Sequence, residues 1–266
     1  MRPTTDIHTF IGPYPFRHVP HPDPEVLVRV LAREGIAEAW VGHLPSAFHR
    51  DPTHGNELLA AALAPHSPTL RATPTVRPDW PGWERVLADA AAAGAPAVRA
   101  FPPQWGLGPG DAAMARLVAA CGAAGVVLAL TVRFEDLRQR HWMDAAGDLS
   151  AAAVRALARV DARTHLVVVA AGREMIEEVH WGLTPDERAR VWWDVSWIWG
   201  PPEDHLAHLF RTVGSERFLF GTGWPLRLTQ TPTANLQLLP DDVRERPLAH
   251  PSDVVASARR HASATR

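Results

Sequence analysis

The stretch Gly214–Leu226, GSERFLFGTGWPL, holds the last of eight short apolar segments along this chain. Its residues 217–223 predict a buried strand that runs into a glycine-rich turn. Between the apolar segments lie Ala-, Leu- and Arg-rich stretches with the spacing of amphipathic helices. The predicted strands span residues 4–10, 37–44, 70–76, 96–102, 126–132, 164–171, 191–198 and 217–223, and the predicted helices span 23–35, 55–66, 82–94, 110–125, 149–160, 173–183, 203–214 and 233–249.

Eight strand–helix repeats within 266 residues match the size and order of a (β/α)8 barrel, also called a TIM barrel. No Pro/Ser-rich linker interrupts the alternation, so we expect one domain over residues 1–266. The alternative α/β fold is an open doubly wound sheet. It is disfavoured because no G-x-G-x-x-G motif follows the first strand.

Composition limits the classes of partner. The formal net charge is −2, so the chain has no basic surplus for a nucleic acid. The apolar runs are too short for a membrane span, the N-terminal residues lack a signal-peptide core, and Cys121 is the single cysteine. We therefore expect a cytoplasmic protein with a small-molecule ligand, with neither nucleic acid nor membrane as partner, and we leave a homodimer open.

In a (β/α)8 barrel the functional site lies at the C-terminal ends of the strands. Side chains of a strand alternate between its two faces, which places Asp6, His8 and Phe10 on one face of the first strand. The same rule pairs Asp194 with Ser196 on the seventh strand. The candidates at the strand ends are His8, Phe10, His43, Arg99, Phe101, Thr131, Arg133, Ala170, Arg173, Asp194, Ser196, Thr222, Gly223 and Trp224.

Five segments, in order along the chain, carry a resemblance to a known family. They are DIHTFIGP (6–13), GNELLAAALAPHSPTLRATPTVRP (55–78), GAPAVRAFPP (94–103), VWWDVSWI (191–198) and GSERFLFGTGWPL (214–226). The chain resembles the amidohydrolase superfamily, in the branch that contains metal-dependent decarboxylases and lactone or amide hydrolases. The resemblance runs from Asp6 to Val255 and implies an amidohydrolase-type barrel.

The resemblance also shows what this sequence lacks. The family binds its metal through two His of the first strand, a His ending the fifth strand, often a His on the sixth, and an Asp after the eighth. His8 matches the first of these positions. The others hold Phe10, Thr131, Ala170 and Gly223. A catalytic metal ion needs about three protein ligands, so we expect no inherited metal centre and no cofactor.

Two residues are the catalytic candidates, His8 and Asp194. The unperturbed pKa of a histidine, about 6.5, suits His8 to the role of general base, and Asp194 is either a base itself or the partner that orients the imidazole. The alternatives are a His8 that only hydrogen-bonds within the barrel mouth and an Asp194 that pairs with an arginine. Ser196 is a candidate for substrate binding rather than a nucleophile, because no G-x-S-x-G motif surrounds it.

Arg99 and Arg133 are predicted to project into the same region. Either they clamp a carboxylate or phosphate of the substrate, or they form internal ion pairs with Asp6 or Asp194. Because buried arginines are rare without an anionic partner, both alternatives are open.

The remaining candidates for ligand contact are His43, Thr222 and Trp224. His43 either pairs with His8 or lies in a surface loop. Trp224 and Trp105 are the aromatic pocket candidates, whereas Trp193, Trp197 and Trp199 are expected to face the helices. The loop histidines at 18, 21, 49 and 54 offer a second, less favoured way to bind a metal.

Three classes of function follow. The first is a metal-independent hydrolase, lyase or isomerase that acts on a small carboxylated or lactone-like molecule. The second is a catalytically inactive descendant that binds a small ligand or a protein partner. The third is a metal hydrolase with relocated His ligands. A shared fold does not decide among them.

Overall fold

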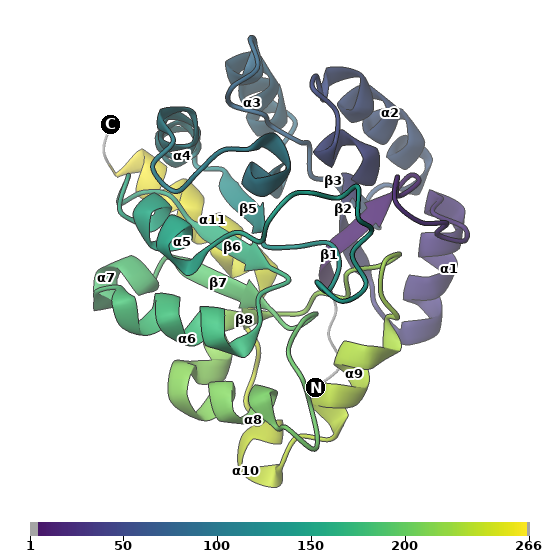
Figure 1. Ribbon diagram of the computed structural model, residues 1–266, viewed down its shortest axis with the longest axis vertical. Coiled ribbons are helices and arrows are strands. Elements are labelled where there is room, and N and C mark those ends of the chain that lie inside the picture. The colour runs from purple at the N-terminus through teal and green to yellow at the C-terminus, as the bar shows by residue number, and fades with distance from the viewer. Residues whose placement is uncertain (1–4, 265–266) are drawn as a thin grey trace.

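The computed structural model describes residues 5–264, and in it eight parallel strands alternate with helices (Figure 1). The strands are β1 Thr5–Ile11, β2 Glu38–His43, β3 Leu70–Ala72, β4 Ala97–Ala100, β5 Val127–Thr131, β6 Leu166–Val169, β7 Val191–Asp194 and β8 Phe218–Leu219. The helices are α1 Pro24–Glu34, α2 Thr53–Leu63, α3 Trp83–Ala92, α4 Ala112–Ala124, α5 Ala151–Ala158, α6 Arg173–Gly182, α7 Pro185–Arg188, α8 His205–Leu209, α9 Gln230–Gln237, α10 Asp241–Arg244 and α11 Pro251–Ser263. Thr4, at the start of the first predicted strand, lies outside the described residues.

The strands form two regular sheets, β1-β2-β3 and β4-β5-β6-β7-β8, which meet at two seams. At one seam the N–H of Arg99 donates to the carbonyl of Pro74, and Thr75 bridges Arg99 in parallel. At the other, the N–H of Ile7 donates to the carbonyl of Phe220, and Thr9 bridges Trp224. These bonds join the strands into a ring, so the expected (β/α)8 fold is confirmed and the open doubly wound sheet is not formed.

The last strand is shorter than expected. Regular pairing stops at Leu219, although the predicted strand continued to Gly223. The next residues still bond to β1, but irregularly, because Gly223 adopts a left-handed φ of 74° that an extended strand does not allow. The N–H of Gly223 donates to the carbonyl of His8 at 2.8 Å. The glycine-rich turn is therefore part of the barrel wall.

Two other predicted elements end early. The seventh strand stops at Asp194 instead of residue 198, because the chain bends and the N–H of Ile198 turns back to the carbonyl of Val195. The predicted helix over 233–249 is divided into α9 and α10 at Pro240, whose ring cannot continue a helix.

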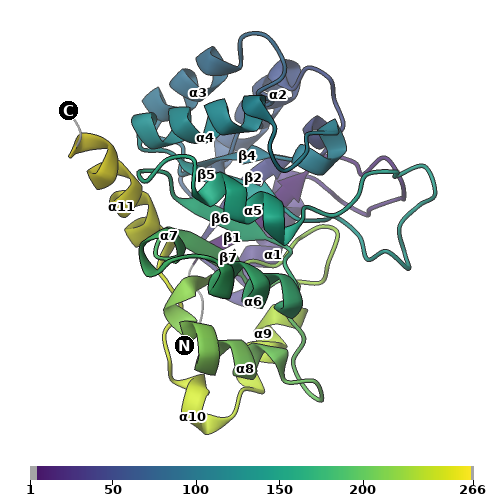
Figure 2. The same cartoon turned by 60° about the vertical axis from the view of Figure 1, so that its left-hand side comes forward.

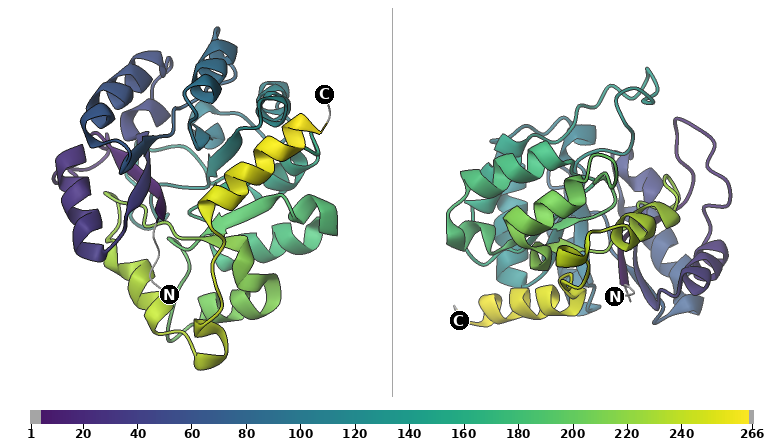
Figure 3. Two further views of the ribbon diagram at one scale, coloured as in Figure 1. Left: turned by 180° about the vertical axis from the view of Figure 1, so that it is seen from behind. Right: turned by 90° about the horizontal axis from the view of Figure 1, so that it is seen from below.

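Helix α11 closes the N-terminal end of the barrel, as the view from behind shows (Figure 3). Val254, Val255 and Ala258 of this helix pack with residues from inside the barrel, among them Ala129 and Leu219. The opposite end carries two long loops, residues 12–23 and 132–150, which project from the barrel (Figure 2). The functional side chains lie at that loop-covered end. Among the described residues, no helix is long and apolar enough to cross a membrane.

Substitution of Val254 tests this role of α11. Its side chain is 2% exposed, so Val254→Asp would bury a carboxyl group against the apolar bottom of the barrel. We expect the free energy of unfolding in urea to fall by roughly 3 kcal/mol or more. Arg260→Gln on the exposed side of the same helix should change it by less than about 0.5 kcal/mol. Equal effects of both substitutions would contradict the packing described.

Candidate active site

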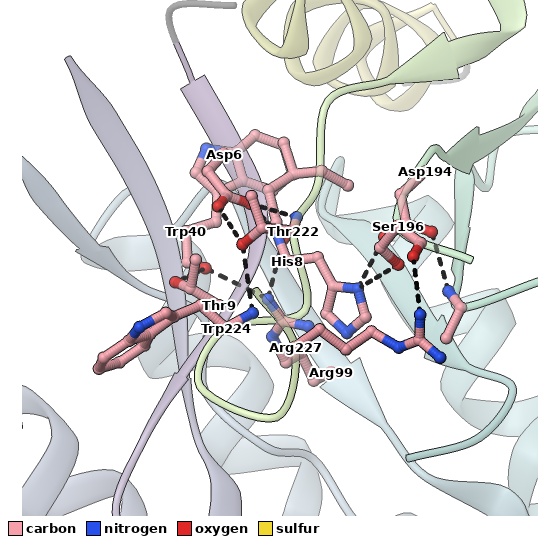
Figure 4. A network of polar contacts seen from close by, with 12 residues as sticks. Asp6, His8, Thr9, Trp40, Arg99, Asp194, Ser196, Thr222, Trp224 and Arg227 are labelled. Atoms are coloured by element: carbon pink, nitrogen blue, oxygen red, sulfur yellow. Dashed lines mark hydrogen bonds and ion pairs between the residues drawn. The ribbon is translucent and has the colours of Figure 1, made fainter. Parts of the chain in front are cut away.

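The centre of the site is a contact between His8 and Asp194, from β1 and β7 (Figure 4). His8 Nδ1 lies 2.7 Å from Asp194 Oδ2 and 3.2 Å from Ser196 Oγ. A carboxylate only accepts hydrogen bonds, so Nδ1 of a neutral His8 carries the proton and Nε2 keeps its lone pair. Of the alternatives open for Asp194, the contact with His8 is the one that forms, and a catalytic role of the pair stays a prediction.

An irregularity in β1 aims the His8 side chain. Asp6 pairs with Ala39 and Thr9 with Val41, so β1 has one residue more than β2 over this stretch. The strict alternation expected for β1 is therefore wrong at this point. Ile7 packs into the barrel interior, and His8, its neighbour, also reaches across the barrel to Asp194.

The second oxygen of Asp194 is also bonded. Asp194 Oδ1 accepts the N–H of Ala170 at 2.8 Å. Ala170 has a φ of 59°, an uncommon left-handed conformation for a residue with a Cβ atom. Its position is one of the metal-ligand positions implied by the family resemblance, and here its backbone holds Asp194 in place.

Asp6 and Thr222 form a second buried contact next to the first. Asp6 Oδ1 accepts the N–H groups of His8 and Thr222, and Asp6 Oδ2 accepts the Thr222 hydroxyl at 2.6 Å. Thr222 Oγ1 in turn accepts the N–H of Trp224. Thr222 therefore ties the eighth strand to the first, and it does not face a cavity.

Arg99 is completely buried, and it forms an ion pair with neither Asp6 nor Asp194, the two acids expected as its internal partners. Its Nε donates to Thr73 Oγ1 at 2.8 Å, and its Nη2 donates to the carbonyls of Ile7 and Trp40. The guanidinium lies 4.7 Å from the centre of the Phe10 ring, a cation–π contact. Nη1 has no hydrogen-bond partner among residues 5–264. An ion pair with Asp6 or Asp194 is not formed, and burial lowers the pKa of Arg99 to about 10.

Arg133 pairs with an acid that sequence reasoning did not consider. Its Nη2 lies 3.0 Å from Asp148 Oδ2, in the long loop after β5. Its guanidinium lies 5.4 Å from the Trp197 ring centre. The expected ion pair with Asp6 or Asp194 is therefore replaced by a pair at the rim of the barrel.

Arg227 was missed by the sequence analysis. Its guanidinium stacks on the Trp197 ring at 3.4 Å, and its Nη1 contacts the Ser196 carbonyl at 3.4 Å. Trp197 was expected to face the helices, and this is wrong because β7 ends three residues earlier and alternation no longer applies. The only signal in the sequence was that Arg227 follows the glycine-rich turn closely.

A small cavity lies between His8 and the two arginines Arg133 and Arg227. It is lined by His8, Arg133, Phe134, Ala170, Trp197, Gly223, Leu226 and Arg227. Its volume is about 10 Å³, which is room for about one water molecule. The aromatic rings of Phe10, Phe101 and Phe134 pack against one another beside it, with ring centres 5.5 to 6.3 Å apart. The barrel mouth is thus largely filled by side chains.

Three predicted ligand contacts lie away from this cavity. His43 is buried, not in a surface loop, and its Nδ1 meets Ser46 Oγ at 2.8 Å rather than pairing with His8. Burial lowers the pKa of His43 to about 4. Trp224 and Trp105 are both 8% exposed and pack in the hydrophobic core, and the Trp105 indole donates to the Ala47 carbonyl.

The donor atoms do not fit the metal centre that the family resemblance implies. Phe10 places an apolar ring at the second His position, and the Arg99 guanidinium already lies over this ring in a cation–π contact. Thr131 offers one hydroxyl, buried and without a hydrogen-bond partner in the described chain. Over residues 5–264, which include the loop histidines, no three His, Cys, Asp or Glu side chains gather as ligands for one ion. No reaction step is therefore assigned to a metal ion.

Comparison with solved structures places this fold among known barrels. A probable 2-pyrone-4,6-dicarboxylic acid hydrolase from Acinetobacter baumannii with citric acid bound is 11% identical, with a TM-score of 0.64 over 96% of this chain and 100% of the other. An uncharacterized TIM-barrel protein from Bordetella bronchiseptica is 14% identical, with a TM-score of 0.66 over 96% and 99%. A dihydroxybenzoic acid decarboxylase from Polaromonas sp., with bound manganese and the inhibitor 2-nitroresorcinol, is 13% identical, with a TM-score of 0.66 over 100% and 98%.

These likenesses confirm the expected (β/α)8 TIM-barrel fold over nearly the whole chain. At 11 to 14% identity, these likenesses establish the fold and do not establish the chemistry. No family model matches the sequence, and no curated protein matches it either.

The titration of Asp6 offers a test of the buried network. Burial raises the pKa of Asp6 to about 7, whereas an Asp in an unfolded chain titrates near 4. Between these pH values the folded chain keeps a proton that the unfolded chain releases, so the contribution of Asp6 to stability falls as pH rises. We expect the stability of the wild type relative to Asp6→Asn to fall by up to ~4 kcal/mol from pH 4 to 7, measured in urea. A flat difference over this window would contradict the buried position of Asp6.

Proposed function

We propose that this protein is a metal-independent hydrolase or lyase of the amidohydrolase superfamily, acting on a small carboxylated molecule with His8 as general base. One observation carries the proposal. Asp194 holds His8 Nδ1 at 2.7 Å, while His8 borders the small cavity together with Arg133 and Arg227. A base with a fixed tautomer and two cations around one cavity is an arrangement suited to an anionic substrate.

The protonation state of His8 favours this role. Burial lowers the pKa of His8, and the neighbouring Arg99 and Arg227 cations lower it further, although Asp194 acts in the opposite direction. The imidazole is therefore neutral at physiological pH, and its Nε2 is able to accept a proton. Asp194 stabilises the imidazolium that forms when it does.

Arg227 is the group best placed to hold a carboxylate. No carboxylate lies in ion-pair contact with it among the described residues, whereas Arg133 has Asp148. Its flat guanidinium is held against Trp197. Burial lowers the pKa of Arg227, and a bound anion would offset that cost. We assign Arg227 to substrate binding, with Arg133 and Ser196 beside it.

The names of the structural neighbours suggest the substrate class. One is a probable hydrolase of a pyrone dicarboxylic acid, and another decarboxylates a dihydroxybenzoic acid. Both substrates are carboxylated rings. In the hydrolytic case, His8 Nε2 would take a proton from a water molecule while the water oxygen attacks the lactone carbonyl carbon. The ring C–O bond then breaks, and His8 Nε2 donates that proton to the leaving ring oxygen.

A second candidate function rests on the closed barrel mouth. The cavity beside His8 holds about one water, and packed aromatic rings fill the space where the substrate of a larger site would lie. This favours a catalytically inactive descendant in which the His8–Asp194 pair is structural. The two candidates differ in turnover, which the next experiment measures.

The test is a search for turnover in chelator-treated protein, with 2-pyrone-4,6-dicarboxylate and 2,6-dihydroxybenzoate as first substrates and thermal shift as the binding readout. We expect product to form at the same rate before and after EDTA treatment. His8→Asn should lower kcat by about 10²- to 10⁴-fold because the base is lost. Thermal stabilisation without product would support the inactive descendant, and activity that needs added Mn²⁺ or Zn²⁺ would refute the proposal.

Substitution of Arg227 separates binding from catalysis. Arg227→Gln removes the cation but keeps a polar side chain of similar reach, so we expect the dissociation constant of a carboxylated ligand to rise by about 10- to 100-fold. The methyl ester of the same ligand should bind both proteins equally. The matched control is Arg138→Gln, because Arg138 is an exposed arginine in the loop after β5 and its substitution should have no effect. Equal loss of ester and acid would show that Arg227 acts through folding instead.

A further inference from the structure

A second cavity lies well outside the barrel mouth. Its volume is about 570 Å³, within the range of small-molecule sites, and α1, α9 and α10 contribute to its wall. These helices lie around the β8–β1 side of the barrel in the view from behind (Figure 3). The cavity exists because the segment after β8 is broken into short helices, so no long helix covers that seam.

The wall of this cavity is apolar on one side. Phe220 follows β8, Phe210 begins the π-helical turn after α8, and Leu236 projects from α9. Leu239 and Leu248 complete this apolar side. Such a wall favours an apolar chain or ring, because burying apolar surface away from water stabilises the complex.

The rest of the lining is mixed and includes three arginines. Arg33, Arg244 and Arg246 line the cavity, against Glu34 as the one acid among its lining residues. Arg33 is paired with Glu34, and Arg244 with Asp241. These two arginines are therefore already compensated by acids.

Arg246 differs from the other two arginines. Its Nε donates to the Asp242 carbonyl and its Nη1 to the Phe210 carbonyl, both at 3.2 Å. These bonds fix the guanidinium at the cavity. Within residues 5–264 no carboxylate forms an ion pair with it, and the Asp242 carboxylate that attracts it is itself paired with Arg211. A fixed cation beside an apolar wall matches a ligand with one anionic end and one apolar end.

We propose that this cavity is a binding site for an amphipathic carboxylate, such as a medium-chain fatty acid, with its carboxylate on Arg246 and its chain against Phe210, Phe220 and Leu236. The site is separate from the His8 cavity, so the proposal does not depend on the proposed enzyme activity.

The experiment compares decanoate, decan-1-ol and decyltrimethylammonium by isothermal titration calorimetry on the full chain. We expect decanoate to bind, decanol to bind at least about tenfold more weakly, and the cation not to bind. Arg246→Gln should weaken decanoate by about tenfold or more and leave decanol unchanged. Arg246→Lys keeps the charge and should have a smaller effect.

Two further variants locate the site. Leu236→Trp fills the cavity and should abolish decanoate binding, with circular dichroism to show that the fold persists. Arg227→Gln, in the barrel mouth, should leave decanoate binding unchanged. Absence of binding below the critical micelle concentration, equal binding of all three probes, or full binding by a folded Leu236→Trp protein would each overturn the proposal.

Discussion

The closure of the barrel at the β8–β1 seam is the constraint on which the candidate site depends. The regular pairing of β8, over Phe218–Leu219, is with β7, and the seam to β1 is held instead by irregular backbone hydrogen bonds, such as those from Ile7 to Phe220 and from Gly223 to His8. The Asp6 side chain completes it by accepting three hydrogen bonds, from the His8 and Thr222 backbones and from the Thr222 hydroxyl. A buried carboxyl group is costly unless it is bonded in this way. The seam therefore fixes both ends of the network, the backbone of His8 and the turn that begins at Thr222.

The same seam explains why residue 221, at the start of the glycine-rich turn, is a glycine. A Cβ atom on Gly221 would come within 2.6 Å of Asp194 Oδ2 and 2.9 Å of the His8 Cβ. The eighth strand thus passes so close to the His8–Asp194 pair that only a glycine fits. Gly223, at the position where the family resemblance implies an acid, lies instead near the side chain of Arg227. Where the resemblance implies an acid, this chain has a turn with a left-handed glycine, followed by the cation of Arg227.

The sequence was sufficient for the architecture because strand and helix periods alternate along its whole length, and this pattern depends on local physics. It also offered the His8–Asp194 contact as one of the alternatives for Asp194, since both residues fall at strand ends of one barrel. It failed where regular structure stops. The partners of Arg133 and the position of Trp197 depend on loop geometry after β5 and β7, which periodicity does not encode. His43 and Trp224 were misplaced because a strand end near the mouth is not necessarily open to a cavity.

The barrel interior contains buried acids whose negative charge is balanced by nearby arginines. A metal ion in such a site would supply positive charge to offset buried acids such as Asp6 and Asp194. Here Arg99, fully buried and electrostatically attracted to both acids, supplies a positive charge from within the chain. Arg227 adds a second at the mouth, attracted to Asp194. A guanidinium cannot lower the pKa of a bound water as a metal ion does, so the proposed function assigns proton transfer to a side chain. The neutral imidazole of His8, held by Asp194, is the group in contact with the cavity that has the chemistry to provide it.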